Sequence, residues 1–250
     1  MADFKSLIAS GRLIVEDCLP STNSRLKELA MEGAAEGTVL IARRQTGGRG
    51  RMERQFVSPE GGLYYSMLLT PDCSPEQSLS LTPCAAVAVH RAIEALCGVS
   101  ADIKWPNDLM LRGKKICGIL CESVFFASQQ KLIVGIGINV STAPEAFGWE
   151  LADTAASLLS VLGRAPTVDE MAAELTAQLD SVYALWQQDH RAFLEEYRRH
   201  CVNLCKSVSL IKNGISRSAT ALDIDSDYAL VVEYPDGERE HIHTGEVSLR

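Results

Sequence analysis

The sequence predicts an α+β protein in which a mixed α/β domain, residues 1–203, precedes a small β-barrel, residues 204–250. Apolar residues first recur in alternating strand-like and helix-like patterns, and from about residue 204 only short strand-like runs remain. A chain of 250 residues that is 46% hydrophobic can form one large domain with a small addition. Since no low-complexity tract or long linker separates the two parts, we expect them to pack against each other.

Strand and helix patterns alternate along the first part. Runs that are β-branched or aromatic and bounded by glycine or polar residues predict central strands at 38–44, 62–69 and 131–140. Helices are predicted where apolar residues recur every three to four positions, at 22–32, 80–97 and from the capping box 167–170 to Trp186. We expect the apolar stripes of these helices to form the core.

The second part has the pattern of β structure throughout. Its five strand-like runs cover 208–211, 218–222, 228–232, 240–243 and 246–249. Asn213-Gly214 and Pro235-Asp236-Gly237 are strong turn signals between them. Short strands joined by tight turns are typical of a small barrel.

Composition excludes several classes of protein. The net charge is -8, with 24 basic against 32 acidic residues, and this balance disfavours general binding to duplex DNA, which needs a basic face. The N-terminus lacks a basic segment followed by an apolar run, and no apolar stretch approaches the ~18–20 residues of a membrane span. We therefore expect a cytoplasmic protein with no membrane partner.

The eight cysteines do not predict a metal centre. Cys117 and Cys121, like Cys201 and Cys205, are spaced as possible half-sites, but the five histidines fall at unrelated positions. Without a secretion signal the cysteines are expected to stay reduced. We expect no metal site built from protein ligands alone.

Residues 46–54 place Arg49, Arg51 and Arg54 on a glycine-rich loop in this acidic chain. Glycine lets the backbone approach a ligand, and guanidinium groups bind phosphate oxygens in pairs, so the loop suits a nucleotide or an acyl-phosphate. A disordered nucleic-acid-binding tract and a solvated turn are the alternatives.

Three further segments have the character of a site. In residues 104–108, Pro106 stiffens a turn after a strand and presents Lys104, Asn107 and Asp108 to one side. Residues 113–120 put Lys114 and Lys115 at the edge of an apolar strand, where a solvated hairpin is the alternative. Residues 135–140 alternate glycine with isoleucine, which either clears room for a ligand or marks tight packing.

Together and in this order, these segments resemble the catalytic domain of the biotin protein ligases, and the resemblance covers nearly the whole chain. The matching residues are Ser21-Thr22-Asn23, Gln45-Thr46, Gly48-Arg49-Gly50-Arg51, Ser58-Pro59, Lys104 to Leu109, Lys114-Lys115, Gly118-Ile119-Leu120, Gly135 to Val140 and Gly245 to Leu249. The resemblance implies a mixed α/β catalytic domain with a C-terminal SH3-like barrel. It also implies that biotin and MgATP give biotinyl-5'-adenylate, and that the biotin then passes to a lysine of a biotin carboxyl carrier domain.

The resemblance also implies roles for individual residues. We expect a catalytic set of Lys115, Arg51 and Asp108. The biotin-binding set is Ser21, Thr22, Asn23, Gln45, Arg49, Gly50, Arg51 and Lys115, and the nucleotide-binding set is Arg49, Arg51, Arg54, Lys104, Asn107 and Asn139. Magnesium is expected to arrive with ATP.

A few positions depart from the family pattern. Met52 and Glu53 stand where the family usually has a basic or small residue and then a glycine, and Glu53 would repel phosphate if it pointed inward. Cys205 replaces a common glycine and Phe56 a common tryptophan, and we expect neither to touch the chemistry. Only about twenty residues precede Ser21, too few for a winged-helix domain, so a ligase without DNA binding is expected.

Two alternatives stay open. Residues 43–48 also resemble the Arg-Arg-x-Ser-Gly-Gly pattern of lipoate ligases and octanoyltransferases. A non-catalytic module whose arginine loop binds RNA or another anion is the second. The oligomeric state, monomer or homodimer, is not predicted.

Overall fold

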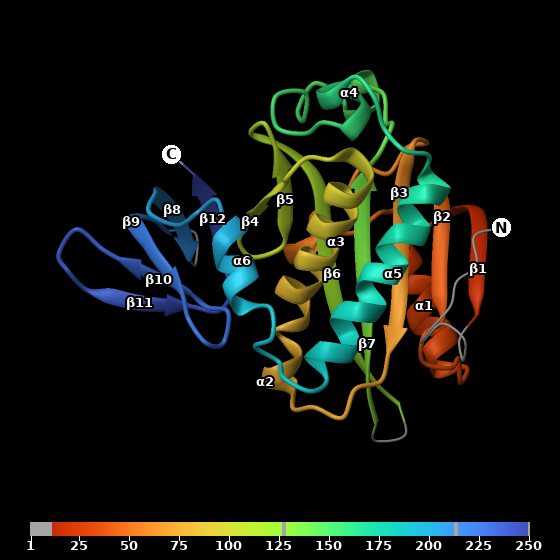
Figure 1. Ribbon diagram of the computed structural model, residues 1–250, viewed down its shortest axis with the longest axis horizontal. Coiled ribbons are helices and arrows are strands. Elements are labelled where there is room, and N and C mark those ends of the chain that lie inside the picture. Colours follow the sequence, from red (N-terminus) through yellow and green to blue (C-terminus); the bar gives the residue numbers. More distant parts are fainter. Residues whose placement is uncertain (1–11, 127–128, 213–214, 250) are drawn as a thin grey trace.

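The computed structural model describes residues 12–126, 129–212 and 215–249, which form two β-sheets with helices (Figure 1). The larger sheet has the strand order β1-β2-β3-β7-β6-β5-β4. Its strands are β1 (Leu13–Leu19), β2 (Val39–Gln45), β3 (Gly62–Leu69), β4 (Asp102–Lys104), β5 (Asp108–Leu111), β6 (Lys114–Phe126) and β7 (Gln129–Asn139). Only β1 and β2 pair in parallel; the other neighbouring strands are antiparallel. The three predicted central strands correspond to β2, β3 and β7.

Helices cover both faces of this sheet, as Figure 1 shows. Helix α1 (Thr22–Met31) packs on one face through Leu26, against Leu40 and Ile133 of the strands. Helices α3 (Leu81–Cys97) and α5 (Val168–Trp186) lie together on the other face. Because successive side chains of a strand point to opposite faces, the sheet has an apolar layer on each side.

The three long helices begin and end close to their predicted limits. Ser21 caps α1 by accepting a hydrogen bond from Ser24 N, and Thr167 forms a capping box with Glu170 at the start of α5. Gly98, with φ of 68°, ends α3 in the left-handed conformation that glycine favours. The remaining short helices are α2 (Pro75–Ser78), α4 (Leu158–Leu162), α6 (Leu194–His200), η2 (Arg51–Glu53) and η3 (Pro144–Phe147).

The C-terminal part is one antiparallel sheet of order β11-β10-β9-β8-β12. Its strands are β8 (Ser207–Lys212), β9 (Ile215–Ile224), β10 (Leu230–Glu233), β11 (Arg239–Ile242) and β12 (Glu246–Leu249). The predicted β-rich tail is confirmed, and the end strands β11 and β12 are not paired with each other in the described residues. The turn after β10 is closed by Tyr234 N donating to Glu238 O at 2.8 Å. The turn predicted at Asn213-Gly214 lies outside the described residues.

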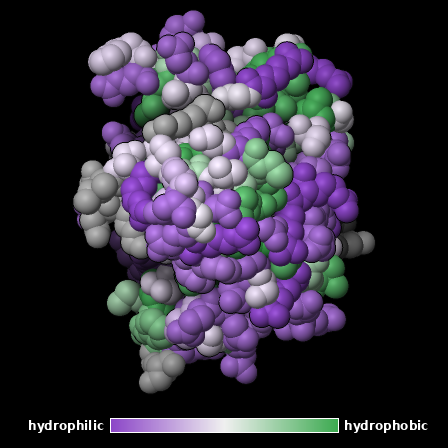
Figure 2. Space-filling model, turned by 90° about the vertical axis from the view of Figure 1, so that its left-hand side faces the viewer, coloured by the Kyte–Doolittle hydropathy of each residue, from purple (hydrophilic) through white to green (hydrophobic). Residues whose placement is uncertain are grey.

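The two parts are joined by buried contacts around Trp105. Its indole Nε1 donates across the boundary to Tyr228 O at 3.0 Å, while its backbone N donates to Asn203 Oδ1 of the same part at 2.8 Å. The rings of Tyr197 and Tyr228 meet edge to face at 5.7 Å. The end of the molecule that carries this sheet presents a mainly hydrophilic surface with separate hydrophobic areas (Figure 2), since the sheet turns its apolar side chains inward.

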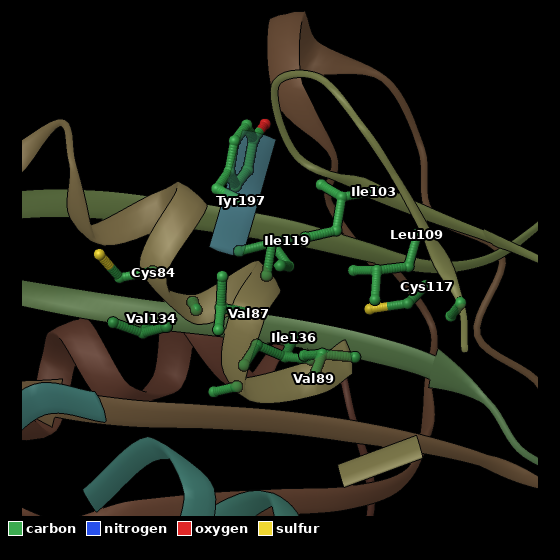
Figure 3. Packing of buried hydrophobic residues seen from close by; sticks show 14 of the residues in the cluster. Cys84, Val87, Val89, Ile103, Leu109, Cys117, Ile119, Val134, Ile136 and Tyr197 are labelled. Carbon is green, nitrogen blue, oxygen red and sulfur yellow. The ribbon is translucent and has the colours of Figure 1, made fainter. Parts of the chain in front are cut away.

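The core between α3 and the large sheet is continuous and mainly aliphatic. Val87 and Val89 of α3 lie over Ile119 of β6 and Ile136 of β7 (Figure 3), and all four are at most 2% exposed. Close packing of this kind holds the sheet rigid, so the opposite face can carry a site without deforming. None of the helices in the described ranges is long and apolar enough to cross a membrane.

Candidate active site

A cavity of about 530 Å³ lies where the arginine loop, the start of α1 and strands β6 and β7 meet, a size usual for a small-ligand site. Every site residue expected from the sequence lines it. These residues are Ser21, Thr22, Asn23, Gln45, Arg49, Gly50, Arg51, Arg54, Lys104, Asn107, Asp108, Lys115 and Asn139. We call this cavity the cleft.

One end of the cleft consists of neutral polar side chains that hold one another in place. Gln45 Oε1 accepts from Thr22 N at 2.8 Å, and Gln45 Nε2 donates to Ser58 Oγ at 2.9 Å. Ser66 donates to Asn23 Oδ1 at 2.6 Å and its Oγ lies 2.8 Å from Thr22 Oγ1. Buried hydroxyls and amides fixed in this way can recognise a ligand that both donates and accepts hydrogen bonds. We call this group the polar end.

The alternating glycines of β7 leave space that other side chains occupy. A Cβ on Gly135 would overlap with Asn23 Oδ1, and one on Gly137 would stand 2.5 Å from Phe56 Cε1. Gly118 on β6 is likewise close to Phe56 and to the Lys115 side chain. The missing side chains therefore admit Asn23 and Phe56, both of which line the cleft.

Replacing Gly135 with alanine is expected to lower the free energy of unfolding by about 1–3 kcal/mol, because the new methyl group must displace Asn23. Urea denaturation measures the change. Gly47→Ala is the matched control, since its Cβ would meet only Pro20 O at an ordinary 3.6 Å. Equal stabilities of the two variants would contradict this account of the strand.

The arginine loop is a short hairpin. Gly50 N donates to Arg54 O at 2.7 Å and Phe56 N to Gly48 O at 2.9 Å. Met52 and Glu53 have φ of 55° and 59°, which is uncommon for residues other than glycine. Both are exposed, and Glu53 is not among the residues that line the cleft, so its carboxylate does not face the expected phosphate site.

The other end of the cleft is cationic, and we call it the charged end. Lys115 Nζ lies 2.6 Å from Asp108 Oδ1, a contact that is an ion pair rather than an aligned hydrogen bond. Arg51 donates to Asn107 Oδ1 at 3.3 Å, and burial lowers the pKa of its guanidinium. Asn107 is itself fixed by donating from Nδ2 to Ile119 O at 2.8 Å. Cations held by such contacts are arranged in advance to receive an anion.

Asn139 lies at the end of β7 with 3% of its surface exposed. Its Nδ2 donates to Ala156 O at 3.0 Å, while its Oδ1 is buried without a hydrogen-bond partner. A buried acceptor without a partner costs free energy unless a ligand supplies a donor. Asn139, which lines the cleft, therefore has an acceptor that a ligand could use.

Comparison with known proteins supports the resemblance seen in the sequence. Residues 15–139 match the Biotin/lipoate A/B protein ligase family. The chain belongs to this family. Residues 206–250 match the Biotin protein ligase C terminal domain, which accounts for the second sheet.

Individual members of the ligase family resemble the chain over different lengths. The biotin--[acetyl-CoA-carboxylase] ligase of Paracoccus denitrificans is 33% identical over 240 residues, 91% of this chain and 96% of the relative. The bifunctional ligase/repressor BirA of Bacillus subtilis is 44% identical over 161 residues, 64% of this chain and 50% of that protein, so the match spans about half the length of this relative. Biotin protein ligase from Aquifex aeolicus, solved with biotin and ATP, superposes with a TM-score of 0.81 at 31% identity, covering 96% of this chain and 98% of that one.

Our sequence analysis did not identify every residue that lines the cleft. Phe56, which we expected not to touch the chemistry, lines the cleft, with its ring over Gly137 and the ring centroid 5.9 Å from Lys115 Nζ. Gly245, Val247 and Ser248 of the second sheet also form part of the wall. Periodicity could not have found them, since each enters the cleft through contacts between distant segments.

All eight cysteines lie in the described residues, and none forms a disulfide there. Burial raises the pKa of the Cys121 thiol to about 11. No group of histidine, cysteine, aspartate or glutamate in the described ranges could hold a metal ion.

Proposed function

We propose that this protein joins biotin to a lysine of a biotin carboxyl carrier domain, with biotinyl-5'-adenylate as the intermediate made from biotin and MgATP. One observation carries the proposal: the neutral polar end and the charged end lie in a single cleft. An acyl-adenylate needs both, since one half of it is an uncharged ring system and the other a phosphate.

The polar end suits the ureido ring of biotin. That ring has one carbonyl acceptor and two N–H donors, and Thr22, Asn23 and Gln45 present both kinds of partner. Tyr64 and Trp105 line the cleft and offer apolar surface for the bicyclic ring and the acyl chain. A dithiolane ring could not replace these hydrogen bonds, so the site disfavours lipoate.

The charged end suits the phosphates of a nucleotide. When a carboxylate oxygen of biotin attacks the α-phosphorus, a P–O bond breaks and pyrophosphate leaves, so two anions must approach each other. Lys115 and Arg51 offset that repulsion and stabilise the charge that develops. The unused Oδ1 of Asn139 would accept from the amino group of the base.

Magnesium enters this proposal with the nucleotide. Two carboxylates line the cleft, Asp108 and Asp153, and an ion already bound to phosphates typically takes one or two carboxylates and keeps several waters. The residues present therefore fit such an ion, which would supply further positive charge at the phosphates.

In the second half-reaction the amine of the acceptor lysine attacks the acyl carbon, and the bond from that carbon to the phosphate oxygen breaks to release AMP. The amine must be neutral when it attacks, and Asp108 is placed to orient it and to accept its proton. The arginine loop would meanwhile cover the adenylate and exclude water. We place this reaction in the cytoplasm and leave open whether the protein acts as a monomer or a homodimer.

The proposal is tested by pyrophosphate exchange. The purified protein should incorporate labelled pyrophosphate into ATP only when biotin and magnesium are present, and should then attach biotin to a carrier domain. Lipoate and octanoate are the controls, because they share the carboxylate and the chain but lack the ureido ring. Exchange with either at the rate seen with biotin would contradict the substrate.

A further inference from the structure

Glu122 lies on β6 beside the cleft without lining it, and only 15% of its side chain is exposed. Three side chains meet this carboxylate. Lys27 Nζ lies 2.6 Å from Oε1, Asn23 Nδ2 donates to Oε2 at 2.8 Å, and Arg49 Nη2 donates to Oε1 at 3.1 Å. Asn23 and Lys27 belong to α1 and Arg49 to the arginine loop, so one carboxylate ties three parts of the fold together.

Toward the polar end, Glu122 fixes the orientation of Asn23. The amide Nδ2 donates both to Glu122 and to Leu120 O, the latter at 3.1 Å. With both donors engaged there, Oδ1 must face Ser66, which donates to it at 2.6 Å. A rotated amide would lose both bonds of Nδ2 and would place Oδ1 against the Glu122 carboxylate and Leu120 O, acceptor against acceptor. Glu122 therefore fixes the amide orientation of Asn23, a residue that lines the cleft.

Toward the loop, Glu122 holds the first of its three arginines. Arg49 donates to Glu122 through Nη2 and to Ser24 Oγ through Nη1 at 3.4 Å, so both terminal nitrogens are engaged on the α1 side. Arg51, two residues later, is directed to Asn107 at the charged end. The two arginines therefore have different roles, since Arg49 anchors the loop and Arg51 remains for the phosphates.

The electrostatics favour an ionised Glu122. Burial by itself raises the pKa of this carboxyl, but the hydrogen bonds from Lys27 and Asn23 and the charge of Arg49 outweigh it, so the pKa lies below its ordinary value. An ionised, partly buried carboxylate with charged donors makes stronger hydrogen bonds than a neutral group.

We propose that Glu122 is a positioning residue that couples the arginine loop to the polar end of the cleft, acting through Arg49 and Asn23 and touching no substrate. Its kinetic consequence rests on the proposed function, because the polar end is where the ureido ring would bind. The structural consequence is independent of the proposed function. The loop of residues 46–54 is held against α1 only while the carboxylate is present.

The test uses Glu122→Gln, which keeps the shape of the side chain and removes its charge. In biotin-dependent pyrophosphate exchange the KM for biotin should rise by about 5–10-fold, the effect of weakening charge-assisted contacts that are partly exposed. The kcat should change little, since Lys115 and Arg51 are untouched. Limited trypsin digestion without ligands should cut the loop faster at its arginines than in the unaltered protein.

Glu196→Gln is the matched control. Glu196 also pairs with an arginine, Arg91, with Arg91 Nε donating to it at 2.8 Å, and its side chain is 25% exposed, but it lies on α6 and does not line the cleft. This control should lose stability without a change in KM or in loop cleavage. Equal effects of the two variants would show that Glu122 serves stability alone and would overturn the proposal.

A double-mutant cycle tests the route through Arg49. In an Arg49→Gln background, Glu122→Gln should add little to loop cleavage, because the anchor is already lost. Glu122→Asp keeps the charge on a shorter side chain. Its loop should therefore be cut more slowly by trypsin than the loop of Glu122→Gln. Additive effects of Glu122→Gln and Arg49→Gln on the rate of loop cleavage would show that Glu122 does not act through Arg49. If the unaltered protein shows no exchange, the proposed function fails, while the digestion still decides whether Glu122 holds the loop.

Discussion

Lys115→Ala is expected to slow adenylate formation by about 10²–10³-fold, equivalent to ~2.7–4 kcal/mol, by analogy with the removal of one donor from an oxyanion site. Lys115 Nζ already lies 2.6 Å from Asp108 in the cleft, so the cation is in place before charge builds on the phosphate. Without Lys115, the negative charge that develops on the phosphate in the transition state has lost this cation. Rapid-quench measurement of biotinyl-5'-adenylate over time would give the rate directly.

Lys114→Ala provides the control for this variant. Lys114 is the adjacent residue on β6, but its Nζ donates to Ala152 O at 3.0 Å and it does not line the cleft. Its replacement should leave adenylate formation unchanged. A Lys115 variant that is folded and forms adenylate at the unaltered rate would remove this lysine from the chemistry.

Arg51→Ala is expected to weaken retention of the adenylate more than its formation. A loop that loses a phosphate contact no longer closes firmly, and a charge-assisted hydrogen bond of ~1.5–3 kcal/mol corresponds to release faster by about 10–100-fold. Reactive adenylate should then leave the site and label lysines of unrelated proteins. A streptavidin blot against a bystander protein measures this labelling.

The two variants should therefore differ in a way that separates the half-reactions. Bystander labelling should rise with Arg51→Ala and should not rise with Lys115→Ala, because little adenylate is made without the lysine. Arg43→Ala is the control, since Arg43 pairs only loosely with the exposed Asp17, at 3.5 Å, and lies outside the cleft. If Arg51→Ala abolished adenylate formation while Lys115→Ala preserved it, the two roles would be reversed.

The elements that could be predicted from the sequence are those with local signals. The helix over 22–32 is observed at Thr22–Met31 and the strand over 62–69 at Gly62–Leu69, because caps, periodicity and turn residues act over a few positions. Strand β1 was missed. It is an edge strand with Glu16 and Asp17 in its middle, and its pairing with β2 rather than its own pattern makes it a strand.

For the site, the amino-acid sequence was enough to indicate which residues to consider, because the arginine loop and the Lys104–Asp108 turn have the composition of an anion site and the ordered segments resemble the biotin protein ligases. Their partners became known only from the folded chain: Arg49 pairs with Glu122, Lys115 with Asp108, and Phe56 fills the space above Gly137. Folding also brings Val247 of the second sheet to the same cleft. Charge and size are properties of single residues, whereas a partner is selected by distance and burial, which exist only once segments far apart in the chain have packed together.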